Sequence, residues 1–213
     1  YHPGGDSFIT RDGRTYVNTW RRPSLVPRTG VTDEDIAPFL AHAEHLLPDK
    51  AQRAVIFDFM AYTLQKPEQK INWAIFLGGD QGIGKDTLFV PLMKLVGEEN
   101  HRIVSSDMLT SNFNEWAATK LVIIEEMAAF GNVAIVNKLK PYIAAPPYKL
   151  PINGKFLRPY EVPNIGNYVL FSNREDALPL DETDRRYFIC WSKAEKRDDA
   201  YYRDLYAWFD ANL

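Results

Sequence analysis

The sequence predicts an α/β fold with a central, mostly parallel β-sheet flanked by helices. Two observations lead to this prediction. Continuously apolar runs, typical of strands buried on both faces, lie at residues 73–77, 121–124, 168–171 and 187–191. Segments with helical spacing alternate with these runs, and no internal repeat interrupts the alternation. Parallel strands need such crossover connections.

Composition narrows the class of protein. The 213 residues, 46% of them hydrophobic, suffice for one large domain or for one domain with an appendage. A net charge of −3 argues against a wholly basic nucleic-acid coat but allows a local basic patch. The single cysteine, Cys190, excludes an intrachain disulfide and suits a reducing cytosol. No apolar run approaches the roughly 18 residues of a membrane span, so we expect no membrane association. The start at Tyr1 predicts a piece of a longer protein.

The first element is a basic arm with a short strand near residues 15–20. It is interpreted as a surface arm packed on the core, or as a contact for a second subunit or for nucleic acid. A helix is expected from about residue 32, with a start delayed by Pro38, and a second one after Asp49 as its N-cap. His42 and His45 lie three apart, but no third metal ligand is evident. We therefore expect residues 1–68 to form an N-terminal β arm and small helical subdomain, and residues 69–213 to form the core.

A glycine-rich loop follows the first core strand. It fits the first seven positions of G-x-x-x-x-G-K-[ST], but the eighth position holds Asp86 and Thr87 comes next. A helix-like run with Leu88, Leu92 and Leu95 follows. Backbone N–H groups of such a loop and the helix N-terminus bind phosphate, and Lys85 would neutralise the β- and γ-phosphates. The loop predicts nucleoside triphosphate binding by Gly79, Gln81, Gly82, Ile83, Gly84, Lys85, Asp86 and Thr87.

Two acids, Glu125 and Glu126, end the strand at residues 121–124. A buried strand can deliver such carboxylates to a phosphate pocket, where one holds Mg²⁺ and the other polarises the attacking water. We assign Glu125 to the metal and Glu126 to the water. The alternative is a strand that ends in two solvated acids. The position of the pair after Lys85, in the same α/β stretch, favours the first interpretation.

Two further signals lie downstream. Asn173 ends the strand at residues 168–171 and could contact the γ-phosphate or orient the water, although Asn at a strand end is often a turn residue. Arg185 and Arg186 precede the last strand. An Arg placed across a subunit boundary stabilises charge on a transferring phosphoryl group. Alternatively, both are surface residues paired with Asp181, Glu182 and Asp184.

In this order and spacing the four motifs resemble superfamily 3 helicases, which are hexameric AAA+ motors of viruses, phages and plasmids. The run Pro-Tyr-Glu-Val-Pro-Asn at residues 159–164 is similar to the phage and prophage group with primase-associated helicase domains. The resemblance extends over about residues 15–192. It implies a P-loop NTPase fold of the AAA+ type, use of ATP and Mg²⁺, a homo-oligomeric, hexameric ring, and single-stranded DNA as partner. It also implies a primase or polymerase domain on the full-length chain, and the cytoplasm of a bacterial host.

The resemblance also implies roles for individual residues. Arg185 or Arg186 would be an arginine finger acting in trans, and Asn173 would be sensor 1. The Walker A residues would be Gly79, Gly82, Gly84 and Lys85, and the Walker B residues Glu125 and Glu126. Two departures stand out. Asp86 replaces the Mg²⁺-binding hydroxyl, so that Asp86 or Thr87 would join Glu125 at the metal. The tail after Trp191 is short, with one amphipathic helix near residues 201–209 and no evident full AAA+ lid.

The family carries a DNA-holding β-hairpin between Walker B and sensor 1, and residues 152–156 suit it. Asn-Gly at 153–154 favours a tight hairpin turn. A basic tip with an aromatic side chain suits a sequence-indifferent grip on single-stranded DNA. The predicted DNA-binding residues are Lys149, Asn153, Lys155 and Arg158. An ordinary surface hairpin is the alternative.

The sequence therefore favours the ATP-driven, DNA-unwinding motor domain of a phage or prophage replication protein, working as a ring. A nucleotide-dependent loader or assembly ATPase that does not unwind DNA is the second interpretation. A small-molecule P-loop kinase is the third, but the lid and acceptor site that it needs are not evident.

Overall fold

The computed structural model describes residues 1–11, 13–25, 28–127, 133–177 and 183–213. A five-stranded sheet with the order β4-β5-β8-β3-β9 forms its centre. All four neighbouring pairs in this sheet are parallel, which confirms the predicted α/β class. The strands are β3 (Ala74–Gly78), β4 (His101–Val104), β5 (Leu121–Ile124), β8 (Asn167–Ser172) and β9 (Tyr187–Trp191).

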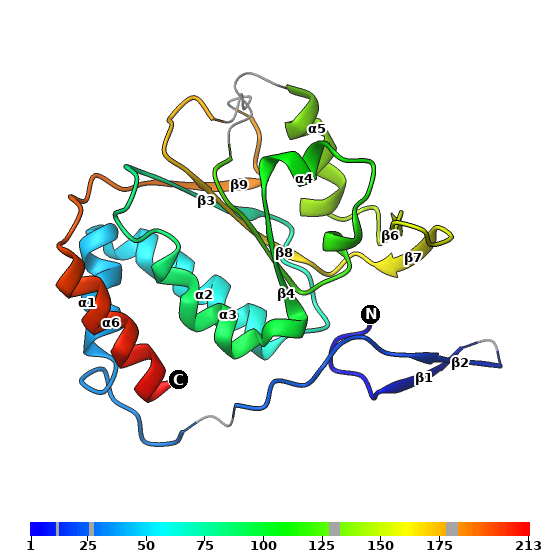
Figure 1. Ribbon diagram of the computed structural model, residues 1–213, viewed down its shortest axis with the longest axis horizontal. Coiled ribbons are helices and arrows are strands. Elements are labelled where there is room, and N and C mark those ends of the chain that lie inside the picture. Colours follow the sequence, from blue (N-terminus) through cyan, green and yellow to red (C-terminus); the bar gives the residue numbers. More distant parts are fainter. Residues whose placement is uncertain (12, 26–27, 128–132, 178–182) are drawn as a thin grey trace.

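Helices cover both faces of the sheet (Figure 1). Side chains alternate along each strand, so that Ile75 and Leu77 join one core while Ala74 and Phe76 join the other. The first core lies under α1 (Ala37–Leu46), α2 (Lys50–Gln65) and α3 (Val90–Val96), and α6 (Asp199–Asn212) packs beside α1. The second lies under α4 (Ser106–Thr110) and α5 (Val133–Ile143). Burial on both faces explains why the core strands are apolar throughout.

The four predicted strands of the sheet are confirmed, but the fifth strand, β4, was not predicted from the sequence. Strand β4 forms an edge of the sheet, and only Val104 of its residues is buried. His101 and Arg102 give it no continuous apolar run. The opposite edge strand, β9, keeps an apolar run and was predicted, whereas the exposed residues of β4 are partly polar and hide it.

The predicted helices are also present. Helix α1 begins at Ala37 with Pro38 in its first turn, which is the delayed start expected from the proline. Asp49 caps α2, and its carboxylate accepts a 2.8 Å hydrogen bond from the backbone N–H of Ala51. In the described part of the chain, short 3₁₀ turns complete the helical segments at Thr87–Phe89, Glu98–Asn100 and Glu115–Ala117.

Two small antiparallel hairpins lie outside the sheet (Figure 1). One pairs β1 (Phe8–Arg11) with β2 (Arg14–Val17), and the other pairs β6 (Lys149–Ile152) with β7 (Tyr160–Pro163). The second confirms the hairpin predicted between the acids and Asn173. The prediction of a tight Asn-Gly turn was wrong. The last residue pair of the hairpin is Ile152 with Tyr160, and the seven-residue segment 153–159 connects the strands.

The two N-terminal helices share their core with the sheet, since Leu46 and Phe59 belong to the same cluster as Ile75. The division of the chain at residues 68 and 69 stays a prediction. Among the described residues, none of the helices has both the length and the apolar character needed to cross a bilayer.

Candidate phosphate and metal site

The glycine loop connects β3 to the 3₁₀ turn that precedes α3. Its glycines 79, 82 and 84 have φ values of 146°, 78° and 87°, which favour glycine. At Gly79 a Cβ atom would also lie 2.8 Å from the side chain of Ile83 and from the carbonyl oxygen of Ser192. The sequence therefore fixes a backbone that curls tightly at the C-terminal edge of the sheet. Gln81 is exposed on this loop, whereas Ile83 is buried in the core.

Lys85 folds back over its own loop. Its Nζ donates hydrogen bonds of 2.7 Å to the carbonyl oxygens of Gly79 and Asp80. Burial lowers the pKa of Lys85, while the carboxylates of Asp86 and Asp80 act in the opposite direction. The ammonium group is thus held within the concave side of the loop by backbone carbonyls.

Asp86 and Thr87, the two residues that could replace the missing Ser or Thr hydroxyl as a metal ligand, lie in different surroundings. Asp86 is exposed. Thr87 is buried, and its Oγ1 lies 3.3 Å from the hydroxyl of Tyr206 on α6. The Thr87 hydroxyl is therefore engaged with the C-terminal helix.

Glu125 and Glu126 follow β5 and are both exposed. Glu126 has a φ of 50°, a left-handed conformation that non-glycine residues seldom adopt. Its carbonyl accepts a 2.9 Å hydrogen bond from the Ser106 hydroxyl at the start of α4. Partial burial raises the pKa of Glu125, and the carboxylates of Asp86 and Glu126 raise it further. The influence of Asp86 on Glu125 means that the fold brings the loop and the acid pair together.

These carboxylates suit magnesium better than a fully protein-bound metal. The described part of the chain contains no group of three or more His, Cys, Asp or Glu side chains placed to hold a metal ion. Mg²⁺ is usually held by one or two carboxylates together with phosphate oxygens and water. Asp86 and Glu125 match that requirement.

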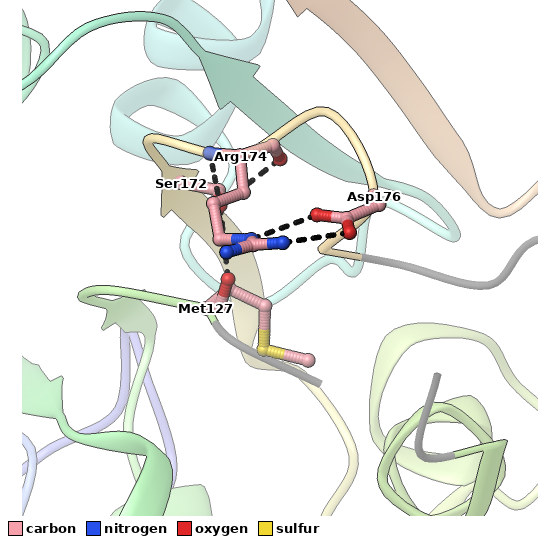
Figure 2. A network of polar contacts seen from close by, with 4 residues as sticks. All are labelled: Met127, Ser172, Arg174 and Asp176. Carbon is pink, nitrogen blue, oxygen red and sulfur yellow. Dashed lines mark hydrogen bonds and ion pairs between the residues drawn. The ribbon is translucent and has the colours of Figure 1, made fainter. Parts of the chain in front are cut away.

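Asn173 lies directly after β8, and its exposed side chain makes no hydrogen bond to any described residue. Figure 2 shows a network of polar contacts formed by the residues on either side of it. The Ser172 hydroxyl donates a 3.0 Å hydrogen bond to the carbonyl of Met127 and accepts one of 3.1 Å from the N–H of Arg174. Two 2.8 Å contacts join the Arg174 guanidinium to Asp176. The segment after β8 is therefore tied to the segment that carries the acids.

The Arg174–Asp176 pair was not predicted from the sequence, and His42 on α1 was considered there only as a metal ligand. The Nε2 atom of His42 lies 2.9 Å from the carbonyl oxygen of Gly84 in the loop. Arg174 adjoins Asn173, so its position in the sequence was a usable signal. His42 lies far from the loop in the sequence and offered none.

The arginine pair lies at the opposite ends of the strands from the phosphate loop. Both arginines precede β9, which is parallel to β3, so they lie at the N-terminal ends of the strands. At about 3.3 Å per residue, the length of β9 separates them from the loop by roughly 13 Å or more. Arg186 pairs with Asp184 at 3.2 Å, and Arg185 is exposed without a hydrogen bond or ion pair to a described residue. Asp181 and Glu182 lie outside the described residues.

A pocket of about 1050 Å³ adjoins both arginines. The C-terminal part of α5 contributes Lys140 to its wall, and Asn72 contributes from the segment before β3. The pocket is therefore basic and is separate from the phosphate loop of the same chain.

The β6–β7 hairpin carries the four predicted DNA-binding residues. Its connection carries Phe156, which is 94% exposed with a φ of 63°, and the Lys155 Nζ lies 5.3 Å from the centre of that ring. Arg158 is exposed nearby. The charge of Lys149 is partly offset by Glu161 at 3.6 Å. Asn153 donates a 3.0 Å side-chain hydrogen bond to the carbonyl of Asn112, so it anchors the hairpin to the core.

Comparison with known proteins identifies relatives. The chain is 28% identical over 196 residues to the DNA primase-polymerase of Nitratiruptor phage NrS-1. The match covers 89% of this chain and 26% of that protein, so the chain spans about a quarter of its relative.

Solved structures share the fold. An apo structure of the NrS-1 C-terminal region matches with a TM-score of 0.78 and 20% identity, over 100% of this chain and 54% of that one. The JCV helicase, solved with a bound acetamide compound, matches with a TM-score of 0.50 and 14% identity, over 84% of this chain and 50% of that one.

A described family matches the region that carries the candidate site. The match covers residues 76–186, just over half of the chain, from β3 to Arg186. The chain belongs to the family of unknown function DUF5906.

Proposed function

We propose that this chain is the ATP-driven helicase domain of a phage or prophage replication protein. One observation carries the proposal. Strand β8 lies between β3 and β5, so the phosphate loop, Asn173 and the two acids follow the C-terminal ends of three adjacent strands. The phosphate-binding backbone and its lysine therefore lie at the same end of the sheet as the Asn side chain and the two carboxylates.

The residues at this edge divide the work of hydrolysis. The loop backbone and Lys85 would bind the β- and γ-phosphates. Asp86 and Glu125 would hold Mg²⁺, which would supply neutralisation of the charge that develops on the phosphoryl oxygens. Glu126 polarises the attacking water, and Asn173 orients it against the γ-phosphate. We assign the metal position to Asp86 because the Thr87 hydroxyl is directed at Tyr206.

The arginine pair supports hydrolysis between subunits. Arg185 is too far along the sheet to reach its own loop, so a contact with a phosphoryl group requires a neighbouring copy. Repetition of that contact gives a closed, hexameric ring of P-loop ATPases of the AAA+ type, as in the superfamily 3 helicases that the sequence resembles.

The β6–β7 hairpin supplies a grip on single-stranded DNA. Lys155 and Arg158 contact phosphates, and Phe156 offers an exposed ring on which a base can stack. Lys149 adds a weaker cation, and Asn153 positions the connection. Movement of such hairpins during hydrolysis would draw the strand through the ring.

The relatives of this chain favour this assignment over other uses of a phosphate loop. A primase-polymerase and a viral helicase both act in replication, which favours a primase or polymerase domain elsewhere in the full-length protein. A phage replication protein would act in the cytoplasm of its bacterial host. The second candidate is a loader or assembly ATPase that grips DNA without unwinding it, since the same site would serve both.

A strand-displacement assay with ATP, run beside sizing of the oligomer, tests the proposal. Lys85→Ala is expected to abolish ATP hydrolysis because the phosphate loop loses its cation. Lys94→Ala is the matched control, since Lys94 on α3 is exposed and pairs with Asp210 at 2.6 Å. Glu126→Gln should bind ATP but turn it over about 10²–10⁴-fold more slowly.

The outcomes separate the candidates. ATP-dependent displacement by an oligomer supports the helicase. ATP hydrolysis and DNA binding without displacement favour the loader. Hydrolysis that persists in Lys85→Ala would overturn the assignment of the site.

A further inference from the structure

His42 connects the phosphate loop to the C-terminal helix. It lies on α1, is fully buried, and places its Nε2 2.9 Å from the carbonyl oxygen of Gly84 and its Nδ1 3.0 Å from the Tyr201 hydroxyl. Tyr201 belongs to α6. A single side chain therefore contacts the loop on one side and a helix more than 150 residues later on the other.

The protonation of this ring follows from its partners. A backbone carbonyl can only accept, so Nε2 carries a hydrogen and donates to Gly84. Burial lowers the pKa of His42, which favours the neutral ring. In the neutral ring Nδ1 has no hydrogen and accepts from the Tyr201 hydroxyl. The Gly84 carbonyl thus selects the tautomer that donates to the loop, and the Tyr201 hydroxyl holds the other ring nitrogen.

The direction of one peptide unit depends on this hydrogen bond. The carbonyl of Gly84 and the N–H of Lys85 belong to the same planar trans peptide and point in opposite directions. The Gly84 carbonyl also accepts from the N–H of Leu88 at 3.2 Å. Two donors therefore hold the carbonyl, and the Lys85 N–H points away from both, which is the direction that a phosphate-binding N–H needs.

The packing leaves no room for a side chain at Gly84. A Cβ atom there would lie 2.7 Å from Cε1 of His42 and 2.9 Å from Cε1 of Tyr202. The Tyr202 ring stands edge-on to His42, with centroids 6.3 Å apart. The imidazole thus contacts the peptide backbone directly, with no side chain between them.

We propose that His42 is a positioning residue that aims the Lys85 N–H at a bound phosphate, with Tyr201 holding the imidazole in place through Nδ1. This inference rests on the proposed nucleotide binding. It adds a residue from outside the phosphate-loop motif, and it makes α1 and α6 part of the site. If His42 only filled space in the core, any side chain of similar volume would replace it without loss of ATP binding.

Two amide substitutions separate these roles. His42→Gln can place an N–H donor close to the position of Nε2 and keep the bond to Gly84. His42→Asn is shorter, reaches only the position of Nδ1 and loses that bond. Binding of Mg²⁺-ATP is measured by calorimetry for the wild-type protein and both variants, with thermal unfolding as the control for folding. Should His42→Asn not fold, His42→Leu takes its place as an apolar side chain without a donor.

We expect the dissociation constant for ATP to rise about tenfold or more in His42→Asn, which corresponds to about 1.4 kcal/mol. It should stay within about threefold of wild type in His42→Gln. Equal weakening in both variants, or no change in either, overturns the inference. If the wild-type protein binds ATP and Lys85→Ala does not, such a result contradicts only the role of His42 and leaves the proposed nucleotide site intact. A wild-type protein that binds no ATP overturns both proposals.

Discussion

The guanidinium of Arg186 lies 3.2 Å from both carboxylate oxygens of Asp184, whose side chain is only 7% exposed. The neighbouring Arg185 has no such partner among the described residues and faces solvent. This relationship assigns different roles to two arginines that the sequence alone leaves equivalent. Arg186 holds the turn before β9, and we therefore assign the proposed contact with a second copy to Arg185.

Arg185→Ala is accordingly expected to lower ATP turnover by about 10³-fold or more, because a finger in trans stabilises transition-state charge. Arg186→Ala should instead destabilise the fold by about 1–3 kcal/mol, since Asp184 loses its partner. Steady-state hydrolysis and urea unfolding measure the two effects.

Mixing subunits tests the trans arrangement. Oligomers mixed from Arg185→Ala and Lys85→Ala chains contain some interfaces with an intact loop facing an intact Arg185. Partial recovery of hydrolysis is expected on mixing. No recovery, in oligomers shown to exchange subunits, would contradict a finger in trans.

The metal position can be tested by comparing the residues that follow Lys85. Asp86→Ala should raise the Mg²⁺ concentration needed for half-maximal hydrolysis about tenfold or more, because a carboxylate ligand is lost. Thr87→Val should change it little, since that hydroxyl faces Tyr206. A magnesium titration of hydrolysis measures both, and the reverse order would move the ligand to Thr87. Asp86→Ser, which restores the usual hydroxyl, should retain much of the activity.

The hairpin predicts two separable effects on single-stranded DNA. Lys155→Ala should reduce the salt dependence of binding, the slope of log K against log salt falling by about 0.7. Phe156→Ala should weaken binding by about 1–3 kcal/mol with an unchanged slope, because stacking is lost. Lys149→Ala is the control with the smaller expected effect, since Glu161 offsets its charge. Fluorescence anisotropy at several salt concentrations measures all three. Wild-type affinity in both tip variants would remove the hairpin from the DNA site.

Stability should depend on pH through two buried lysines. Burial lowers the pKa of Lys70 to about 7 and that of Lys120 to about 8. Lys70 donates to the carbonyls of Tyr142 and Gly166 at 2.6 Å. Between pH 7 and the ordinary lysine pKa the unfolded chain binds more protons, so the free energy of unfolding should rise with pH, by up to about 1.4 kcal/mol per unit per lysine.

Urea unfolding at pH 7, 8 and 9 checks this dependence. Lys70→Met should reduce the rise and leave the part that Lys120 contributes above about pH 8, whereas Lys94→Met, an exposed control, should keep the whole rise. Equal slopes in all three proteins would show that Lys70 does not contribute to it.

Much of the fold could be predicted because the sheet is buried on both faces. Strands β3, β5, β8 and β9 each read as continuous apolar runs, whereas the edge strand β4 does not. The prediction of a tight turn at Asn153-Gly154 was wrong because contacts with the core determine the conformation there. The N–H of Asn153 bonds to Asn114 at 2.7 Å, and a Cβ at Gly154 would lie 2.7 Å from the carboxylate of Glu115. These residues dock the hairpin on the core and do not form a two-residue turn.

The site could be predicted to the extent that its residues follow strands in a recognisable order. The loop, the acids and Asn173 occupy the strand ends expected of them, although their roles remain predictions. The contact of His42 with Gly84 could not be found, because no local pattern marks a side chain that reaches a loop from another element. Only the packing of α1 against the loop brings them together.

The position of β8 has a mechanical consequence. Its backbone is hydrogen-bonded along both sides, so sliding it relative to β3 or β5 would break a whole ladder of bonds at once. The sheet is therefore expected to act as a rigid frame during an ATPase cycle. Motion would be confined to the tips beyond the strand ends and to whole chains rotating as bodies, so force would reach the DNA through joints between subunits.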